Sequence, residues 1–163
     1  MASPKTKKTN FHSAPKIQCL KRNALERGPK PTTFMQWMKE PNNIYVSTNL
    51  KKYYQNADER HNRWGHNNLS YKLFSKQIDK NEFMSRYTDY IKKEKWGDLD
   101  QLKNKVLGCW CDIDDTDCHA RILQSLYRQK KNEEFFNKTK KCEKDDPDSV
   151  KHPPSPTGID GES

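Results

Sequence analysis

Three thiols and one imidazole lie close together in the second half of the chain. Cys109, Cys111, Cys118 and His119 fall within eleven residues of a chain of 163 residues that is 31% hydrophobic and 33% charged. Thiolate sulfur and imidazole nitrogen are ligands that tetrahedral Zn²⁺ takes in structural sites. These four residues are therefore candidate zinc ligands.

The spacing of these residues argues both for and against a metal. Because they lie two apart on a predicted strand, Cys109 and Cys111 point to one face of it, and Trp110 points to the other. The loop 112–117 adds four aspartates, whose field raises the pKa of the thiols unless a cation is bound. However, Cys-x-Cys followed by an adjacent Cys-His differs from the usual spacing of zinc ligands.

Two other interpretations of this cluster stay open. Free cysteine is commonly a small buried residue, so the three thiols could simply pack around the end of a strand, with His119 hydrogen-bonded to the loop. Ligands of α/β sheets bind at the carboxyl ends of the strands, so the same corner could also line a substrate pocket.

The elements that must position the cluster follow from periodicity and capping. Residues 106–111 are predicted to form a buried strand, and Asp117 is placed to cap the helix that follows. A second helix is predicted over residues 80–93, because Asp79 and Glu82 resemble a capping box and aromatic residues recur behind them at helical spacing.

Two further strands are predicted before these elements. Residues 43–48 form a β-branched and aromatic run, and residues 69–73 alternate between apolar and polar types. The resulting fold class is α/β or α+β, with one small domain in which helices flank a short sheet.

Changes in composition divide the chain into three parts. Residues 1–40 form a basic, proline-containing arm, residues 41–142 the compact domain, and residues 143–163 an acidic, proline-rich tail. Tails of this kind bury little surface, and they stay disordered or become ordered on a partner. The net charge of +9 favours an anionic partner, such as nucleic acid or an acidic protein face. The candidate contact residues of the arm are Lys5, Lys7, Lys8, Lys16, Lys21, Arg22, Arg27 and Lys30.

A polar loop in the predicted domain adds three candidate contact residues. Arg60, Arg63 and Trp64 combine cationic side chains with an aromatic ring, which suits stacking on a base and contact with a phosphate. A surface loop that one tryptophan anchors to the domain is the simpler explanation. Neither a GxGxxG motif nor a phosphate-binding loop occurs in the sequence.

The stretches 107–111 and 118–123 carry a resemblance to a known family. Leu-Gly-Cys-Trp-Cys, a short loop and Cys-His before a helix rich in leucine resemble a family of small proteins of unknown function from bacteria, phages and large DNA viruses. The resemblance extends over residues 43–126. Ser47-Thr48 stands where the family has Gly-Arg, so an arginine for an anionic substrate is missing. The resemblance therefore implies a relative that kept the framework and lost an ancestral activity.

These observations favour a small, basic, non-enzymatic structural or interaction protein encoded by a virus, such as a virion or assembly component that binds other protein subunits. The alternatives are a protein that binds or processes nucleotides or nucleic acid at the Cys-His corner, and a non-specific nucleic-acid-binding protein that uses the basic arm. No apolar run reaches about twenty residues, and no secretory signal is evident. We therefore expect an intracellular protein, in the host cytoplasm or nucleus, or in the virion. The odd number of cysteines, five, agrees with reduced thiols.

Overall fold

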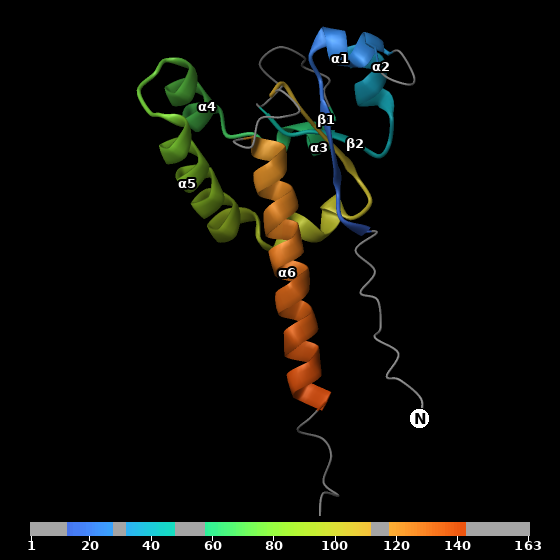
Figure 1. Ribbon diagram of the computed structural model, residues 1–163, viewed down its shortest axis with the longest axis vertical. Helices are drawn as coiled ribbons and strands as arrows, with labels where there is room; N and C mark the ends of the chain where they lie inside the picture. Colours follow the sequence, from blue (N-terminus) through green and yellow to red (C-terminus); the bar gives the residue numbers. More distant parts are fainter. Residues whose placement is uncertain (1–12, 28–31, 48–57, 112–117, 143–163) are drawn as a thin grey trace, which may run out of the picture. The chain divides into compact units, whose positions relative to one another are not determined.

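The computed structural model describes residues 13–27, 32–47, 58–111 and 118–142 of the chain. Within these ranges, short strands alternate with helices (Figure 1). In chain order the elements are β1 (Lys16–Cys19), α1 (Arg22–Arg27), α2 (Phe34–Lys39), β2 (Asn43–Tyr45), α3 (Glu59–Asn62), α4 (Asn67–Phe74), α5 (Lys80–Tyr90), the π-helix η3 (Ile91–Lys95), the 3₁₀-helix η4 (Gly97–Leu102), β3 (Val106–Cys109) and α6 (His119–Cys142).

The three strands form a parallel sheet in the order β1-β3-β2, so the predicted α/β class is confirmed. Strand β3 is central, and Cys109 at its end pairs in register with Cys19 of β1. Tyr45 of β2 pairs with Gly108. The strand that leads into the cysteines therefore ends at the carboxyl edge of the sheet, where parallel α/β sheets bind their ligands.

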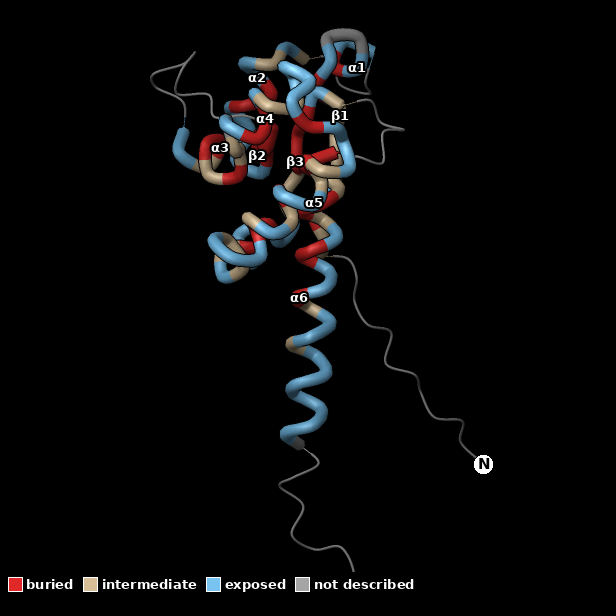
Figure 2. Tube along the Cα trace, turned by 90° about the vertical axis from the view of Figure 1, so that its left-hand side faces the viewer, coloured by how far each residue is buried: buried red, intermediate tan, exposed pale blue. Residues whose placement is uncertain are grey.

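One face of the sheet carries the larger apolar core. Leu107 and Cys109 of β3 point to this face, together with Ile44 of β2. Helices α5 and α6 cover it with side chains such as Tyr87 and Leu123, which are fully buried. Figure 2 shows buried segments in β2 and β3 and in the first turns of α6. Because this core reaches the cysteines, the packing of α5 and α6 decides how the cluster is held.

The opposite face is covered by the first two helices. Leu20, Leu25, Trp37 and Met38 form a second buried cluster there, together with Tyr45 of β2. The prediction that residues 1–40 lie outside the domain is therefore wrong for the part from β1 to α2. The prediction relied on the high charge and proline content of the segment and gave too little weight to its few apolar residues, which pack against the sheet.

The predicted strand over residues 69–73 is also wrong, because this segment lies in helix α4. The side chain of His66 caps the helix by accepting a hydrogen bond from the backbone N–H of Leu69 over 3.2 Å. Leu69 and Leu73 are four residues apart and both contact the larger core, so the segment satisfies a helical period as well as an alternating one.

The predicted helix over residues 80–93 is confirmed. Its cap is Asp79, whose carboxylate accepts a hydrogen bond from the backbone N–H of Glu82 over 2.8 Å. The helix continues from α5 into the π-helix η3. Of the helices that the structure describes, none is both long and apolar enough to cross a bilayer.

A buried histidine should make the stability of the fold depend on pH. The His61 ring accepts a hydrogen bond from the backbone N–H of Tyr45 and lies 3.1 Å from the carbonyl of Met38. Burial lowers its pKa below the ordinary value, and Arg60 adds to this effect. The unfolded chain therefore binds a proton more readily, so this contribution to stability is complete above about pH 6.5 and is lost as the pH falls below it. We expect His61→Asn to lose less thermal stability than the wild type between about pH 7.5 and 5.5. Equal losses in both proteins would contradict this prediction.

Candidate metal centre at the Cys-His corner

The structure brings the predicted ligands together at the carboxyl end of β3. The Sγ atoms of Cys109 and Cys111 are 3.2 Å apart, and Cys109 Sγ lies 3.7 Å from Nδ1 of His119. The donor atoms of these three residues all lie within 4.8 Å of one another. Cys118, the residue before α6, is close enough to the other two thiols to affect their pKa values, but it is not one of the three residues whose donor atoms lie within 4.8 Å of one another. The strand end and the helix start thus form one corner of four candidate ligands.

These distances are close to those of a tetrahedral zinc site. Sulfur and nitrogen ligands of one zinc ion lie about 3.5 to 3.8 Å apart. The separation between Cys109 and His119 falls within this range, and the two sulfurs of Cys109 and Cys111 are somewhat closer. Cys111 is only partly buried, so a small outward movement of its sulfur would accommodate an ion.

The protonation of the cluster also depends on a cation. Hydrogen bonds from the Cys109 and Cys111 thiols, and then from the backbone N–H groups of Ala120 and Arg121, lower the pKa of Cys118. Hydrogen bonds to Cys109 and Cys118, together with burial, raise the pKa of Cys111. Without a cation, these shifts favour ionisation of Cys118 over ionisation of Cys109 or Cys111. Three thiolates require a positive charge among them.

His119 is held as a neutral ring between two aromatic residues of α5. Its ring centroid lies 4.7 Å from that of Phe83 and 5.1 Å from that of Tyr87, in edge-to-face contacts. Burial lowers the pKa of His119 to about 4, so the imidazole is neutral near pH 7, the form that binds metals. Its Nε2 atom is buried and has no hydrogen-bond partner among the described residues.

Tyr87 is a supporting residue that the sequence indicated only as part of a helical apolar face. Its hydroxyl donates a hydrogen bond to the carbonyl of Trp64 over 2.6 Å, and its ring is fully buried against Phe83 and His119. Phe83 and Tyr87 are one helical turn apart and therefore lie on the same side of α5. This spacing could have indicated that both rings pack against one buried side chain, here that of His119.

Removal of the Tyr87 hydroxyl should destabilise the domain. Tyr87→Phe leaves the carbonyl of Trp64 without this donor in the core, which is expected to lower the free energy of unfolding by about 1 to 3 kcal/mol. Tyr71→Phe is the matched control, because Tyr71 is 65% exposed, and we expect a change within about 0.5 kcal/mol. Chemical denaturation of the two variants makes the comparison. Equal stability of the two variants would contradict this role of Tyr87.

Arg60, Arg63 and Trp64, the candidate contact residues of the polar loop, make contacts within the domain. Trp64 is 1% exposed, which leaves no ring face for a base and agrees with its role as an anchor. Arg60 donates hydrogen bonds to the carbonyls of Met38 and Glu40. Arg63 donates to the side chain of Gln101, and its guanidinium also lies 3.6 Å from the carboxylate of Asp98.

The structure describes only part of the basic arm. Lys5, Lys7, Lys8 and Lys30 lie outside the described residues, as does the predicted cap Asp117. Lys16 is an exposed residue of β1, and Lys21 is exposed just before α1. Arg22 and Arg27 are the first and last residues of α1. These residues therefore belong to the folded domain and not to an extended arm.

The comparisons with known proteins support a family relationship but give no function. A family model with the description Domain of unknown function (DUF4326) matches residues 33–129, which is more than half of the chain. The match starts at Thr33, the cap of α2, and includes the whole Cys-His corner. No curated protein and no solved structure matches this chain.

Proposed function

This chain belongs to the DUF4326 family, and we propose that it is a non-catalytic interaction module in which Cys109, Cys111, Cys118 and His119 hold one structural zinc ion. The convergence of the Cys109 and Cys111 thiols with the His119 ring at one corner, with the Cys118 thiol beside them, is the observation that carries this proposal.

The number and burial of the ligands favour a structural ion over a catalytic one. Structural zinc sites are closed by four protein ligands, whereas catalytic sites keep one position for water or substrate. Cys109 is 2% exposed, Cys118 is 3% exposed and His119 is 6% exposed. Three of the four candidate ligands are thus buried and Cys111 is partly exposed, an arrangement that favours four protein ligands over an open position.

Exposed aromatic side chains support a role in protein contacts. Tyr71 and Phe74 lie one turn apart on α4 and are 65% and 75% exposed. A single exposed apolar residue needs no explanation, but adjacent large aromatic groups are typical of protein interfaces. Together with the resemblance of the sequence to a family found in bacteria, phages and large DNA viruses, these aromatic residues support our proposal that the protein is a structural or assembly component of a virus.

Elemental analysis of the purified full chain tests the zinc proposal. We expect about one zinc ion per chain that survives dialysis and is released when the protein unfolds. Measurement of several divalent metals in the same sample separates zinc from a different ion. A protein that is folded and free of metal would overturn the proposal.

Sedimentation of the protein tests the interaction role separately. We expect self-association, or association with a particle subunit, that weakens in the double variant Tyr71→Ser/Phe74→Ser. The matched control is Met35→Ser, because Met35 is also exposed but lies on α2. A protein that stays monomeric and is absent from particles would contradict this role, whatever its zinc content.

A further inference from the structure

Cys111 is the one of the three clustered cysteines that solvent can reach. It is partly exposed, whereas Cys109 is 2% exposed and Cys118 is 3% exposed. Oxidation of a thiol depends on its exposure, so a small oxidant in solution meets the sulfur of Cys111 first. Oxidation of the cluster is therefore expected to begin at Cys111.

The sulfur of Cys109 lies directly beside that of Cys111. Their Sγ atoms are 3.2 Å apart. A disulfide joins two sulfurs at about 2.05 Å, so a movement of about 1 Å brings these sulfurs to bonding distance. Their Cα atoms, two residues apart in the chain, are separated by at most about 7 Å, which is close to the range that disulfides span. The two cysteines can therefore be joined without a rearrangement of the sheet.

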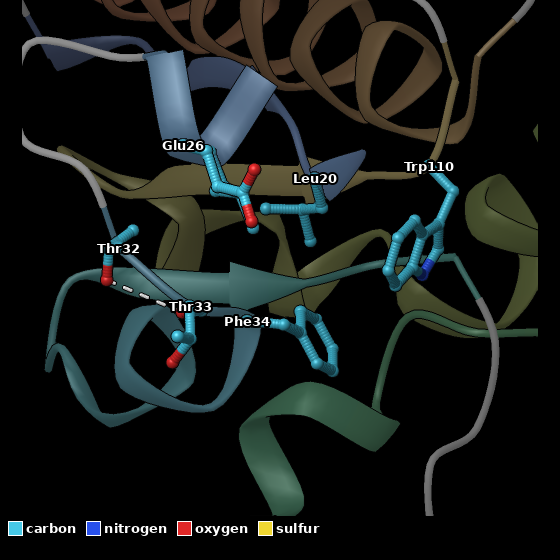
Figure 3. Close-up of a pocket in the computed structure, with 7 residues that line it drawn as sticks. Leu20, Glu26, Thr32, Thr33, Phe34 and Trp110 are labelled. Carbon is cyan, nitrogen blue, oxygen red and sulfur yellow. Dashed lines mark hydrogen bonds between the residues drawn. The ribbon is translucent and has the colours of Figure 1, made fainter. Parts of the chain in front are cut away.

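Trp110, which stands between the two cysteines, contacts the opposite face of the sheet. Cys109 and Cys111 contact the larger core. The indole of Trp110 instead contacts Phe34, and its Nε1 donates a hydrogen bond to the hydroxyl of Tyr45 over 3.0 Å. Figure 3 shows this indole in the lining of a pocket of about 370 Å³, which Phe34 also lines. Because the indole is held on that side, both thiols lie together on the other.

We infer that hydrogen peroxide oxidises Cys111 and Cys109 to a reversible disulfide, and that formation of this bond releases the zinc ion. The release rests on the zinc site proposed above, whereas the bond rests on the positions of the two sulfurs. A disulfide has no thiolate to offer, so the ion would keep only Cys118 and His119. These are two of the four ligands that a structural site needs.

The electrons of this reaction balance between the two thiolates and the peroxide. The Cys111 thiolate attacks one peroxide oxygen, the O–O bond breaks and a hydroxide ion leaves, which gives a sulfenic acid. The Cys109 thiolate then attacks this sulfur, so that the S–S bond forms, the S–O bond breaks and a second hydroxide ion leaves. The two sulfurs together lose two electrons, which reduce one peroxide molecule to two hydroxide ions.

Peptide mapping of the full chain tests this inference. The zinc content is measured first, a stoichiometric amount of hydrogen peroxide is added, released zinc is measured with a colorimetric chelator, and the remaining thiols are alkylated in denaturant. A protease that cleaves before aspartate separates residues 100–111, which contain only Cys109 and Cys111, from the fragment that begins at Asp117 and contains Cys118. We expect fragment 100–111 to be unalkylated and lighter by two hydrogen atoms than its reduced form, with about one zinc ion released per bond. A thiol reductant should reverse both changes, and a sample without peroxide should keep its thiols and its zinc.

Two serine variants locate the bond. Cys19→Ser is the matched control, because Cys19 is also a partly exposed thiol but is not one of the two that react. We expect it to form the same disulfide and to release zinc as the wild type does. In Cys111→Ser the accessible thiol of the pair is gone, so fragment 100–111 should carry an alkylated Cys109 after peroxide treatment.

A bond that includes any other cysteine, a bond between two chains, or oxidation of Cys111 without a bond would overturn the inference. Full alkylation of the peroxide-treated chain would overturn it as well, and zinc that stays bound after the mapped bond has formed would overturn the release. Absence of zinc before peroxide is added would contradict the proposed function alone, because mapping of the bond needs no metal. If Cys111→Ser fails to fold, the map of the wild-type chain still decides the question.

Discussion

Substitution of Cys118 by serine is expected to lower the free energy of unfolding by at least about 4 kcal/mol when zinc is present, because the loss of one thiolate ligand weakens zinc binding by about a thousandfold or more. The carbonyl of Cys118 accepts the first hydrogen bonds of α6, from the backbone N–H groups of Arg121 and Ile122. Cys118 therefore occupies the cap position, where serine is among the most favourable residues.

This choice of residue separates the two interpretations of the cluster. If the thiols only pack, serine preserves the size of the side chain and improves the cap, so the change in stability should be small. If Cys118 binds zinc, serine removes a ligand and the loss should be large. Chemical denaturation, with and without a chelator, measures both cases, and the difference between wild type and Cys118→Ser should largely disappear in the chelator.

Cys19→Ser is the matched control for this experiment. Cys19 is a partly exposed thiol of the neighbouring strand, in register with Cys109, and it is not one of the four candidate ligands. We expect it to keep the wild-type zinc content and to change stability by less than about 1 kcal/mol. Equal losses in Cys19→Ser and Cys118→Ser would contradict the assignment of the ligands.

A valine at position 108 is expected to destabilise the domain by about 3 kcal/mol or more. A Cβ atom at Gly108 would overlap the side chain of Trp37 and lie 2.5 Å from Cδ1 of Leu20. Both side chains are buried in the core of the second sheet face, so neither has free space to move into. The strain falls on the central strand immediately before Cys109, and we therefore expect weaker zinc binding as well as a lower melting temperature.

Gly97→Ala provides the comparison for this prediction. A Cβ atom at Gly97 would have nothing within 4 Å, and its backbone is not in the left-handed region. Alanine there is expected to be neutral or to stabilise the protein slightly, by up to about 1 kcal/mol, because it restricts the unfolded chain. Thermal denaturation of the two variants measures the difference. A stable Gly108→Val would show that α2 does not pack on the sheet as described.

The features that the sequence predicted well are those determined by neighbouring residues. Helix α5 could be predicted because its cap at Asp79 and its buried residues Phe83 and Tyr87 lie within one short segment. Strand β3 and the start of α6 could be predicted because the cysteines, which are close in sequence, mark the end of one element and the start of the next. The candidate zinc ligands are therefore brought together by two elements that follow each other in the sequence.

The features that the sequence did not predict depend on distant contacts. Strand β1 pairs with β3, about ninety residues further along the chain. A local sequence pattern cannot show which distant strand a segment pairs with in a parallel sheet. Trp37 and Leu20 are buried only because Gly108 lets them approach that strand. For the same reason, the pocket beside Trp110 could not be predicted, because α1, α2 and the residues just before these helices form most of its lining.

X-ray absorption spectroscopy at the zinc edge, on the full chain purified with its native metal, tests the central claim most directly. We predict three sulfur ligands at about 2.3 Å and one nitrogen ligand at about 2.0 Å. A first shell with two or fewer sulfurs, or with an oxygen ligand from water, would contradict a closed structural site and would favour an enzyme that works at this corner.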